Sequence, residues 1–316
     1  MFRRSSECLE RHARWGDNQM NCFMTGATST VGQFALHSLL SDEAIEHVSV
    51  LARHPEKFPI EHDKLTVVPG DLLAPSQWQS AANGCDTVVH AAGIMFLPQL
   101  LPLMQTSAAR QFVVVGTTGV FSRFKSASQE YIHDEELLRS FLTENPMVRC
   151  VVLRPTMIYG NPAGHNVSVL LSWFRRHSVF PMFGDGHALI QPVYDADVAS
   201  AVVTAVQQHC EPAGFYNVSG RTPLTYRQFI EAIAAAVGTK PHFVHLPVRA
   251  SAALFETAHW LVPRFRFSGE QVWRTTDDRA FDWSEAGVAF GFAPCSFEEG
   301  LKLELERMGS SAGAER

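Results

Sequence analysis

The first half of the sequence alternates short apolar runs with longer runs of helical periodicity. The apolar runs predict strands at 21–24, 47–51, 65–68, 87–90, 111–115 and 149–153, and the periodic runs predict helices at 31–40, 75–82 and 129–142. Strands separated by helices cannot pair as hairpins, so they form a parallel sheet whose right-handed crossovers place helices on both faces. The sequence therefore predicts an α/β fold with a doubly wound parallel sheet.

Beyond Gly160 the pattern changes, because predicted strands become few and helices dominate. Further helices are expected at 167–176, 197–207 and 226–237. We therefore expect a sheet domain over 20–160 and a smaller C-terminal α/β substrate lobe over 161–308 that is interleaved with it. The polar residues 1–19 predict a flexible extension, and residues 309–316 predict a disordered tail.

The charge balance and the cysteine pattern narrow the classes of partner. A formal net charge of −6 comes without a cluster of basic residues, which argues against nucleic acid and favours a small-molecule substrate. The six cysteines show no CxxC or metal-ligand spacing, so we expect reduced thiols, a cytoplasmic location and no metal site. No window reaches the ~18–20 uninterrupted apolar residues of a membrane span, and none is predicted.

A glycine-containing turn, TGATSTVG, lies between the first predicted strand and the first predicted helix. Glycine lets the backbone turn tightly and approach a pyrophosphate, which the free N–H groups and the dipole of the helix N-terminus attract. This context favours a Rossmann-type dinucleotide site over the alternative, a tight turn that holds no ligand. The predicted cofactor-binding residues of the turn are Gly26, Thr28, Ser29, Thr30, Val31 and Gly32.

Further motifs follow the other predicted strands in a fixed order. They are Gly70-Asp71-Leu72, His90-Ala91-Ala92-Gly93, Gly116-Thr117-Thr118 and the run from Leu153 to Gly160. With the glycine turn, these motifs resemble the extended short-chain dehydrogenase/reductase family, which includes NAD-dependent epimerases and dehydratases, over about residues 20–306. The resemblance implies a Rossmann-type sheet, a homodimer as in many relatives, and cofactor contacts at Asp71, Leu72, Ala91, Ala92, Gly93 and Pro155.

Cofactor preference depends on the end of the second predicted strand. Relatives that use NAD usually carry an acidic residue there, whereas this chain has Ala52 and Arg53. A guanidinium would pair with the 2′-phosphate of NADP through two parallel hydrogen bonds. The sequence therefore predicts NADP as the cofactor, with NAD as the alternative.

The chain departs from the resemblance at the catalytic pair. Members of the family use Tyr-x-x-x-Lys, in which the lysine lowers the pKa of the tyrosine that moves the proton. When the helix is aligned through Glu135, this chain has Ala127 at the tyrosine position and Tyr131 at the lysine position. The remaining catalytic candidates are Thr118, Tyr131 and Tyr159. For Thr118 the alternative is a strand cap, and for Tyr159 it is packing at the interface with the lobe.

These features predict an NAD(P)-dependent oxidoreductase, epimerase or dehydratase that acts on a small-molecule alcohol, carbonyl or sugar nucleotide through a non-standard acid/base group. Two alternatives stay open because the catalytic pair is missing. One is a dinucleotide-binding sensor that resembles the NmrA-like proteins. The other is a structural subunit, similar to the accessory subunit that this superfamily contributes to respiratory complex I.

Overall fold

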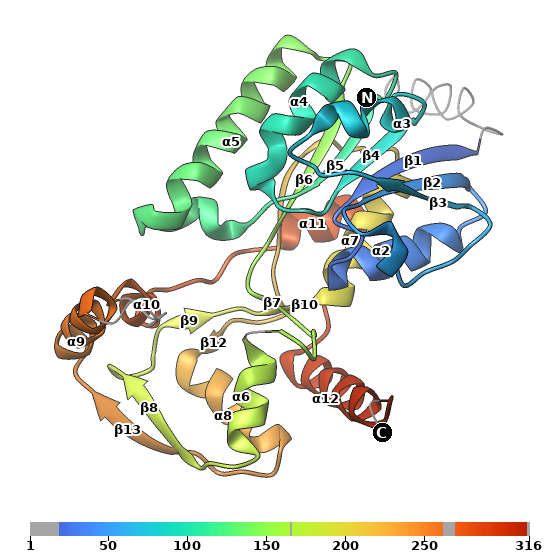
Figure 1. The fold of residues 1–316 in the computed structure, drawn as a ribbon. Coiled ribbons are helices and arrows are strands. Elements are labelled where there is room, and N and C mark those ends of the chain that lie inside the picture. The colour runs from blue at the N-terminus through green and yellow to red at the C-terminus, as the bar shows by residue number, and fades with distance from the viewer. Residues whose placement is uncertain (1–18, 165, 262–268, 315–316) are drawn as a thin grey trace, which may run out of the picture.

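Seven parallel strands form the central sheet of the computed structural model, which describes residues 19–164, 166–261 and 269–314 (Figure 1). The strand order is β11-β6-β5-β4-β1-β2-β3. The strands are β1 Met20–Thr25, β2 Ile45–Ala52, β3 Leu65–Pro69, β4 Thr87–His90, β5 Gln111–Val115, β6 Arg149–Pro155 and β11 Gly214–Val218. All six predicted strands are present, so the α/β class with a doubly wound parallel sheet is confirmed.

The edge strand β11 was not predicted from the sequence. It is five residues long and lies where helical patterns dominate, and a short apolar run there does not distinguish a strand from a loop. Its pairing with β6, from Gly214 opposite Val151 to Val218 opposite Pro155, supplies the hydrogen bonds that define it. Tertiary pairing, rather than local pattern, makes this segment a strand.

Helices cover both faces of the sheet because alternate strand residues point to opposite sides. Met24 and Val50 face a core shared with α2 Thr30–Leu40, α7 Asp195–Gln207 and α11 Ser284–Phe290. Phe23 and Leu51 face a second core, shared with α3 Gln79–Ala82, α4 Leu97–Thr106 and α5 Lys125–Glu144. Single-turn 3-10 helices lie at η1 Pro55–Lys57, η2 Pro75–Gln77, η3 Ile94–Phe96 and η4 Thr118–Phe121.

The helix α4 was also missing from the sequence-based prediction. Its ten residues contain Pro98 and Pro102, which weaken the helical signal. Pro98 lies in the first turn, where a missing N–H has no intrahelical partner to lose. Pro102 is inside the helix, yet Leu100, Leu103 and Met104 are buried in the second core, and this burial holds the segment helical.

The smaller lobe has its own core below the sheet domain (Figure 1). It contains three pairs of short strands: β7 Ile158–Tyr159 with β10 Val193–Tyr194, β8 Val179–Phe183 with β13 His242–Leu246, and β9 Leu189–Ile190 with β12 Leu224–Thr225. Its helices are α6 Val167–Phe174, α8 Tyr226–Ala236, α9 Val248–Leu261, α10 Gly269–Arg274 and α12 Phe297–Ala314. Within the described ranges, no helix is long and apolar enough to cross a membrane.

The two parts are interleaved along the chain. The elements α7, β11 and α11 come from the second half of the sequence but complete the sheet domain. The helix α12 continues to Ala314 and so includes residues 309–314 of the predicted tail. Once earlier turns of a helix are anchored by packing, each added residue gains a hydrogen bond at little further cost. Residues 1–18 of the predicted extension lie outside the described residues.

A buried charged cluster docks α12 against the junction of the two parts. Nη1 of Arg307 donates to both carboxylate oxygens of Asp195, at 3.1 and 3.0 Å, and to the carbonyl of Gly160 at 2.8 Å. Glu304, on the same helix, is 1% exposed, and its Oε2 has no hydrogen-bond partner. Burial and the neighbouring Asp195 charge raise the pKa of Glu304 to about 7.

Candidate functional site

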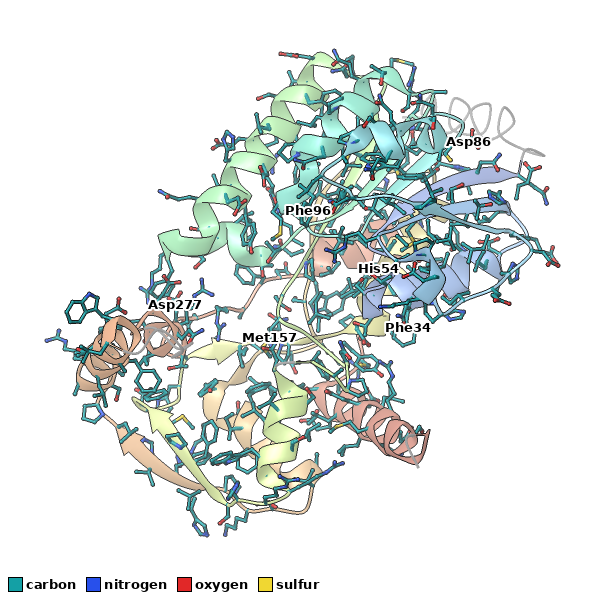
Figure 2. The ribbon with its side chains drawn as sticks, viewed as in Figure 1. Phe34, His54, Asp86, Phe96, Met157 and Asp277 are labelled. Atoms are coloured by element: carbon teal, nitrogen blue, oxygen red, sulfur yellow. The ribbon has the colours of Figure 1, made fainter. Side chains whose placement is uncertain are left out.

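A cavity of about 540 Å³ opens where β1, β2, β3 and β4 end, and we call it the sheet-edge cavity. The parallel order places these strand ends on one edge of the sheet, and the order reverses between β1 and β4. Such a reversal is where open α/β sheets bind their ligands. His54 and Phe96 mark this cavity in Figure 2. It is lined by Thr25, Gly26, Thr28, Ser29, Leu51, Ala52, Arg53, His54, Lys57, Gly70, Asp71, Leu72, Leu73, Ala91, Ala92 and Phe96.

The glycine turn is built by two close approaches of backbone to backbone. Gly26 has φ +76°, and a Cβ there would lie 2.4 Å from the carbonyl carbon of Ala91. A Cβ on Gly32 would lie 2.1 Å from the carbonyl oxygen of Gly26. Both positions therefore require glycine for the fold of the turn itself, which seats the first turn of α2 at the cavity wall.

Ser29, in the middle of the glycine-containing turn, is the N-cap of α2. Its Oγ accepts from the N–H of Gly32 at 3.0 Å and donates to the carbonyl of Gly26 at 2.8 Å. The side chain thus turns back into the loop, as an N-cap serine does. The first-turn N–H groups of Thr30 and Val31 have no intrahelical acceptor and can meet an anion.

His90, at the end of β4, connects this strand to the end of β1 and to the loop that follows β4. Its Nε2 lies 2.8 Å from the carbonyl of Gly93, which can only accept, so this nitrogen carries the proton. Its Nδ1 therefore accepts from the hydroxyl of Thr25 at 2.7 Å. Burial lowers the pKa of His90 to about 4, so the ring is neutral at physiological pH. Sequence reasoning gave His90 no role, because its two partners are known only in the folded chain.

The cations of the sheet-edge cavity gather at the end of β2. Arg53 and Lys57 both line the cavity, and Arg53 is exposed. Among the residues that the structure describes, no carboxylate forms an ion pair with either side chain. Asp71 lies across the cavity after β3, and its Oδ1 accepts from the N–H of Leu73 at 2.9 Å. Asp71 therefore stabilises its own turn and still presents a second carboxylate oxygen.

Not every predicted cofactor residue lines this cavity. Gly26, Thr28, Ser29, Arg53, Asp71, Leu72, Ala91 and Ala92 do so. Val31 is instead packed in the core beneath the turn, and Gly93 holds the His90 ring. Thr30, Gly32 and Pro155 are also outside the lining.

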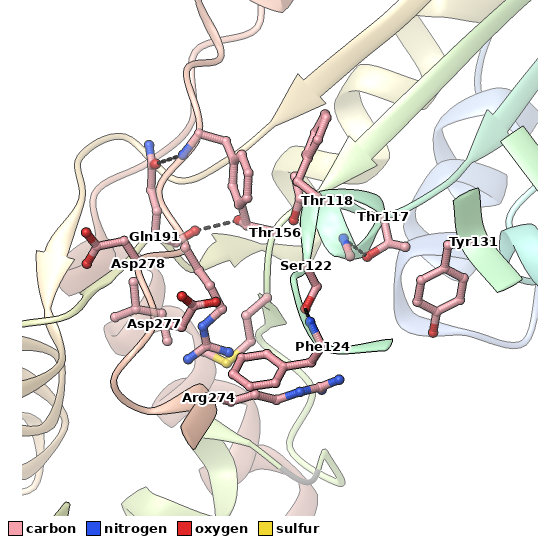
Figure 3. A pocket seen from close by; sticks show the side chains of 16 residues that line it. Thr117, Thr118, Ser122, Phe124, Tyr131, Thr156, Gln191, Arg274, Asp277 and Asp278 are labelled. Atoms are coloured by element: carbon pink, nitrogen blue, oxygen red, sulfur yellow. Dashed lines mark hydrogen bonds between the residues drawn. The ribbon is translucent and has the colours of Figure 1, made fainter. Parts of the chain in front are cut away.

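A second cavity, of about 250 Å³, lies between the sheet domain and the lobe, and we call it the junction cavity (Figure 3). It is lined by Thr117, Thr118, Gly119, Phe121, Ser122, Phe124 and Tyr131 from the sheet domain and by Thr156, Met157, Ile190, Gln191, Arg274, Asp277, Asp278, Arg279 and Phe281 from the crossover and lobe. In Figure 3 Tyr131 lies on the opposite side from Gln191 and Asp278, with Thr117 and Thr118 between them.

The two threonines after β5 use their hydroxyls differently. Oγ1 of Thr118 donates to the carbonyl of Pro155 at 3.1 Å, so its proton is engaged. Oγ1 of Thr117 accepts from the N–H of Gly119 at 3.0 Å, and this bond leaves its own proton available. Thr117 is therefore better suited than the predicted Thr118 to donate to a substrate oxygen.

The two candidate tyrosines lie in different surroundings. Tyr131, on α5, borders the junction cavity, and its ring would be 3.0 Å from a Cβ on Gly119. Tyr159 borders neither cavity, is 4% exposed, and donates to the carbonyl of Phe297 at 3.3 Å. Burial raises its pKa. Tyr159 is a core residue of the lobe, and this position favours packing over a catalytic role.

A buried ion pair at Arg154, the residue before the Pro155 that Thr118 contacts, fixes the segment that crosses into the lobe. Nε of Arg154 donates to Oε1 of Glu135 at 2.7 Å, and Nη2 donates to Oε2. The guanidinium also lies 4.9 Å from the ring of Phe215 and 5.1 Å from that of Phe121. The pair joins α5, which carries Tyr131, to the end of β6, which precedes the crossover.

Contacts across the junction cavity connect the lobe to the sheet domain. Arg123 pairs with Asp277 at 2.6 Å, and the rings of Phe121 and Phe281 stack with centroids 5.4 Å apart. Figure 2 shows Asp277 at this junction. The amide of Gln191, which is buried, accepts from the N–H of Phe281 at 2.9 Å and so fixes the lobe segment that faces η4.

Comparisons with known proteins agree with this geometry. A family model described as NAD(P)H-binding matches residues 26–209. The 2-alkyl-3-oxoalkanoate reductase of Shewanella oneidensis is 25% identical over 89% of this chain and 84% of its own length. The UDP-glucose 4-epimerase of Thermotoga maritima, solved with UDP-glucose, is 18% identical with a TM-score of 0.70, covering 93% of this chain and 100% of that one. The UDP-glucuronic acid 4-epimerase of Bacillus cereus, solved with UDP-glucuronic acid and NAD, is 17% identical with a TM-score of 0.71, covering 92% and 99%.

Proposed function

Because the chain belongs to the NAD(P)H-binding family, we propose that it is an NADP(H)-dependent oxidoreductase or epimerase that acts on a small carbonyl or alcohol substrate. The family match confirms the resemblance predicted from the motifs. The observation that carries the proposal is the pair of cavities at the edge where the parallel strands end. One cavity suits the nucleotide, and the other presents hydroxyl groups to a substrate beside it.

The sheet-edge cavity fits the adenosine and pyrophosphate parts of the cofactor. The N-terminus of α2 offers unpaired N–H groups to the pyrophosphate, and the closely packed turn at Gly26 lets the backbone approach it. Arg53 and Lys57 favour the extra phosphate of NADP, because both cations border the cavity and no acidic residue ends β2. When bound, the nicotinamide would supply or accept the hydride.

The junction cavity provides the groups that handle the substrate. Tyr131 has a hydroxyl able to give a proton to a carbonyl oxygen, and the free proton of Thr117 can orient that oxygen. Thr118 can only accept there, because its hydroxyl already donates its proton to the carbonyl of Pro155. The stacked rings of Phe121 and Phe281 give one side of the cavity an apolar lining. The name of the Shewanella relative, a reductase of an oxoalkanoate, supports carbonyl reduction as the direction.

The proposal is tested by measuring NADPH oxidation with a panel of small carbonyl compounds, followed by tyrosine variants. Tyr131→Phe keeps the ring and removes the hydroxyl, so turnover should fall by ~10²-fold or more while NADPH affinity is unchanged. Tyr159→Phe is the matched control, because its hydroxyl bonds within the lobe core. Equal losses in the two variants would contradict the role of Tyr131. Tight NADPH binding without turnover of any compound would favour the sensor.

A further inference from the structure

We propose that Arg279 is an anion-binding residue of the junction cavity, so that the substrate carries a carboxylate or phosphate besides its reacting carbonyl or alcohol. This inference rests on the proposed function and names the substrate class of the same site. Arg279 borders the cavity on the lobe side, directly after Asp278. Tyr131 and Thr117 border it on the side of the sheet domain. A substrate that spans the cavity would therefore meet hydroxyls at one end and a guanidinium at the other.

The side chain of Arg279 is half-buried, and the inner part of its guanidinium is unpaired. Its Nε is buried and has no hydrogen-bond partner, and within the described ranges no carboxylate forms an ion pair with it. Burial also lowers its pKa. An arginine in this state loses hydration without the compensation that an ion pair or hydrogen bonds supply. A ligand anion that accepts two N–H bonds from the planar fork would provide that compensation.

The other charged side chains of the cavity already have partners. Arg274 pairs with Glu270 at 2.8 Å, and Asp277 pairs with Arg123 at 2.6 Å. Asp278 is exposed, and its Oδ1 accepts from the N–H of Leu189 at 2.8 Å. Solvent screens this carboxylate, whereas Arg279 is half-buried. Among the charged residues that line the cavity, Arg279 is therefore the one whose side chain has neither an ion pair nor a hydrogen bond within the described ranges.

The main chain around Arg279 holds the side chain in place without depending on its charge. The N–H of Arg279 donates to the carbonyl of Leu189 at 2.7 Å, and the two segments form a β-bridge through Ile190. Arg279→Met should therefore fold, because it keeps the aliphatic stem and removes only the fork. Arg279→Lys keeps the charge and loses the paired donors.

The test measures binding by calorimetry with the protein saturated with NADP⁺, so that no hydride is transferred. The probes are acetoacetate against methyl acetoacetate, for a carboxylate, and UDP against uridine, for phosphate. We expect one anion to bind at least ~10-fold more tightly than its neutral counterpart. Arg279→Met should abolish this difference, and Arg279→Lys should keep part of it. Arg249→Met, which removes an exposed cation from α9, is the matched control and should change nothing.

Two outcomes overturn the proposal: neither anion is preferred over its neutral counterpart, or the preference persists in Arg279→Met. NADP⁺ affinity is measured for every variant and should stay constant, since Arg279 does not border the sheet-edge cavity. The same titrations are repeated without nucleotide. A chain that failed to bind NADP⁺ would contradict the proposed function, while its preference between the probes would still report on Arg279.

Discussion

Replacing Glu304 with glutamine should remove a pH dependence of stability that the docking of α12 creates. In the folded chain Glu304 is 1% exposed beside the Asp195 carboxylate, and its pKa is raised from 4.5 to about 7. Below pH 4.5, the ordinary pKa of this side chain, the Glu304 carboxyl is protonated in both the folded and the unfolded chain. Its full contribution to the stability of the fold is therefore present in that range. As the pH rises toward 7, the unfolded chain releases the proton first and is stabilised relative to the folded chain.

The size of the effect follows from the same values. A rise from 4.5 to about 7 corresponds, at about 1.4 kcal/mol per pKa unit, to about 3 kcal/mol of lost stability once the pH exceeds 7. Glutamine cannot ionise, so the free energy of unfolding of Glu304→Gln should improve relative to that of the natural chain by up to this amount between about pH 4.5 and pH 8. A constant difference between the two proteins at all pH values would stem only from packing or a lost hydrogen bond.

The assay is urea unfolding over this pH range, followed by circular dichroism. The control is Glu298→Gln, on the same helix but exposed, whose curve should run parallel to that of the natural chain. The charged groups that face Glu304 are Asp195 and Arg307, beside the phenols of Tyr159 and Tyr194, and all four remain in the variant. Parallel curves for Glu304→Gln and the natural chain would refute the reasoning, because they would mean that Glu304 ionises normally in the folded state.

Three further predictions concern the two cavities. Arg53→Ala should weaken NADP⁺ binding by roughly 1–3 kcal/mol and leave NAD⁺ binding unchanged; calorimetry with both nucleotides checks this, and an equal loss for both would mean that Arg53 supports the loop instead. Gly26→Ala should lower both the melting temperature and NADP⁺ affinity, since its Cβ would lie 2.4 Å from the backbone of Ala91. The control Gly238→Ala has a similar φ of +75° but nothing within 4 Å, so it should cost only about 1–2 kcal/mol. Similar thermal shifts in the two variants would argue against the close approach at Gly26. The double variant Ala127→Tyr with Tyr131→Lys places a phenol and an ammonium one helical turn apart on α5 and should raise NADPH-dependent turnover, measured against each single variant; a folded, NADPH-binding double variant with unchanged turnover would show that the helix no longer presents the pair to the substrate.

The sequence predicted the parts of the molecule that local pattern determines. The six strands and the glycine turn have strong signals, because strand burial and the turn beside α2 both restrict residue type locally. The sequence does not show which way the hydroxyl of Ser29 points. Its hydroxyl could have faced a ligand, and only the position of the Gly32 N–H shows that it closes the loop.

The rest of the site depends on partners distant in the sequence. His90 is held by Thr25, 65 residues earlier, and no spacing rule connects them. For Tyr159 the sequence left both catalysis and packing open, and the acceptor of its hydroxyl is Phe297, 138 residues later. The choice between Thr117 and Thr118 is likewise made by the carbonyl of Pro155. Side-chain chemistry was visible in the sequence, whereas orientation was not.

The interleaving of the two parts limits how such a protein can change its substrate in evolution. Cutting the chain after Gly160 would leave a fragment without α7, β11 and α11, and the sheet would expose β6 and the apolar residues beneath those helices. Because the chain enters and leaves the lobe repeatedly, the lobe cannot be exchanged by one recombination event. New specificity is more readily acquired through point substitutions at positions such as Arg279, or through insertions in the lobe loops, than by shuffling whole domains.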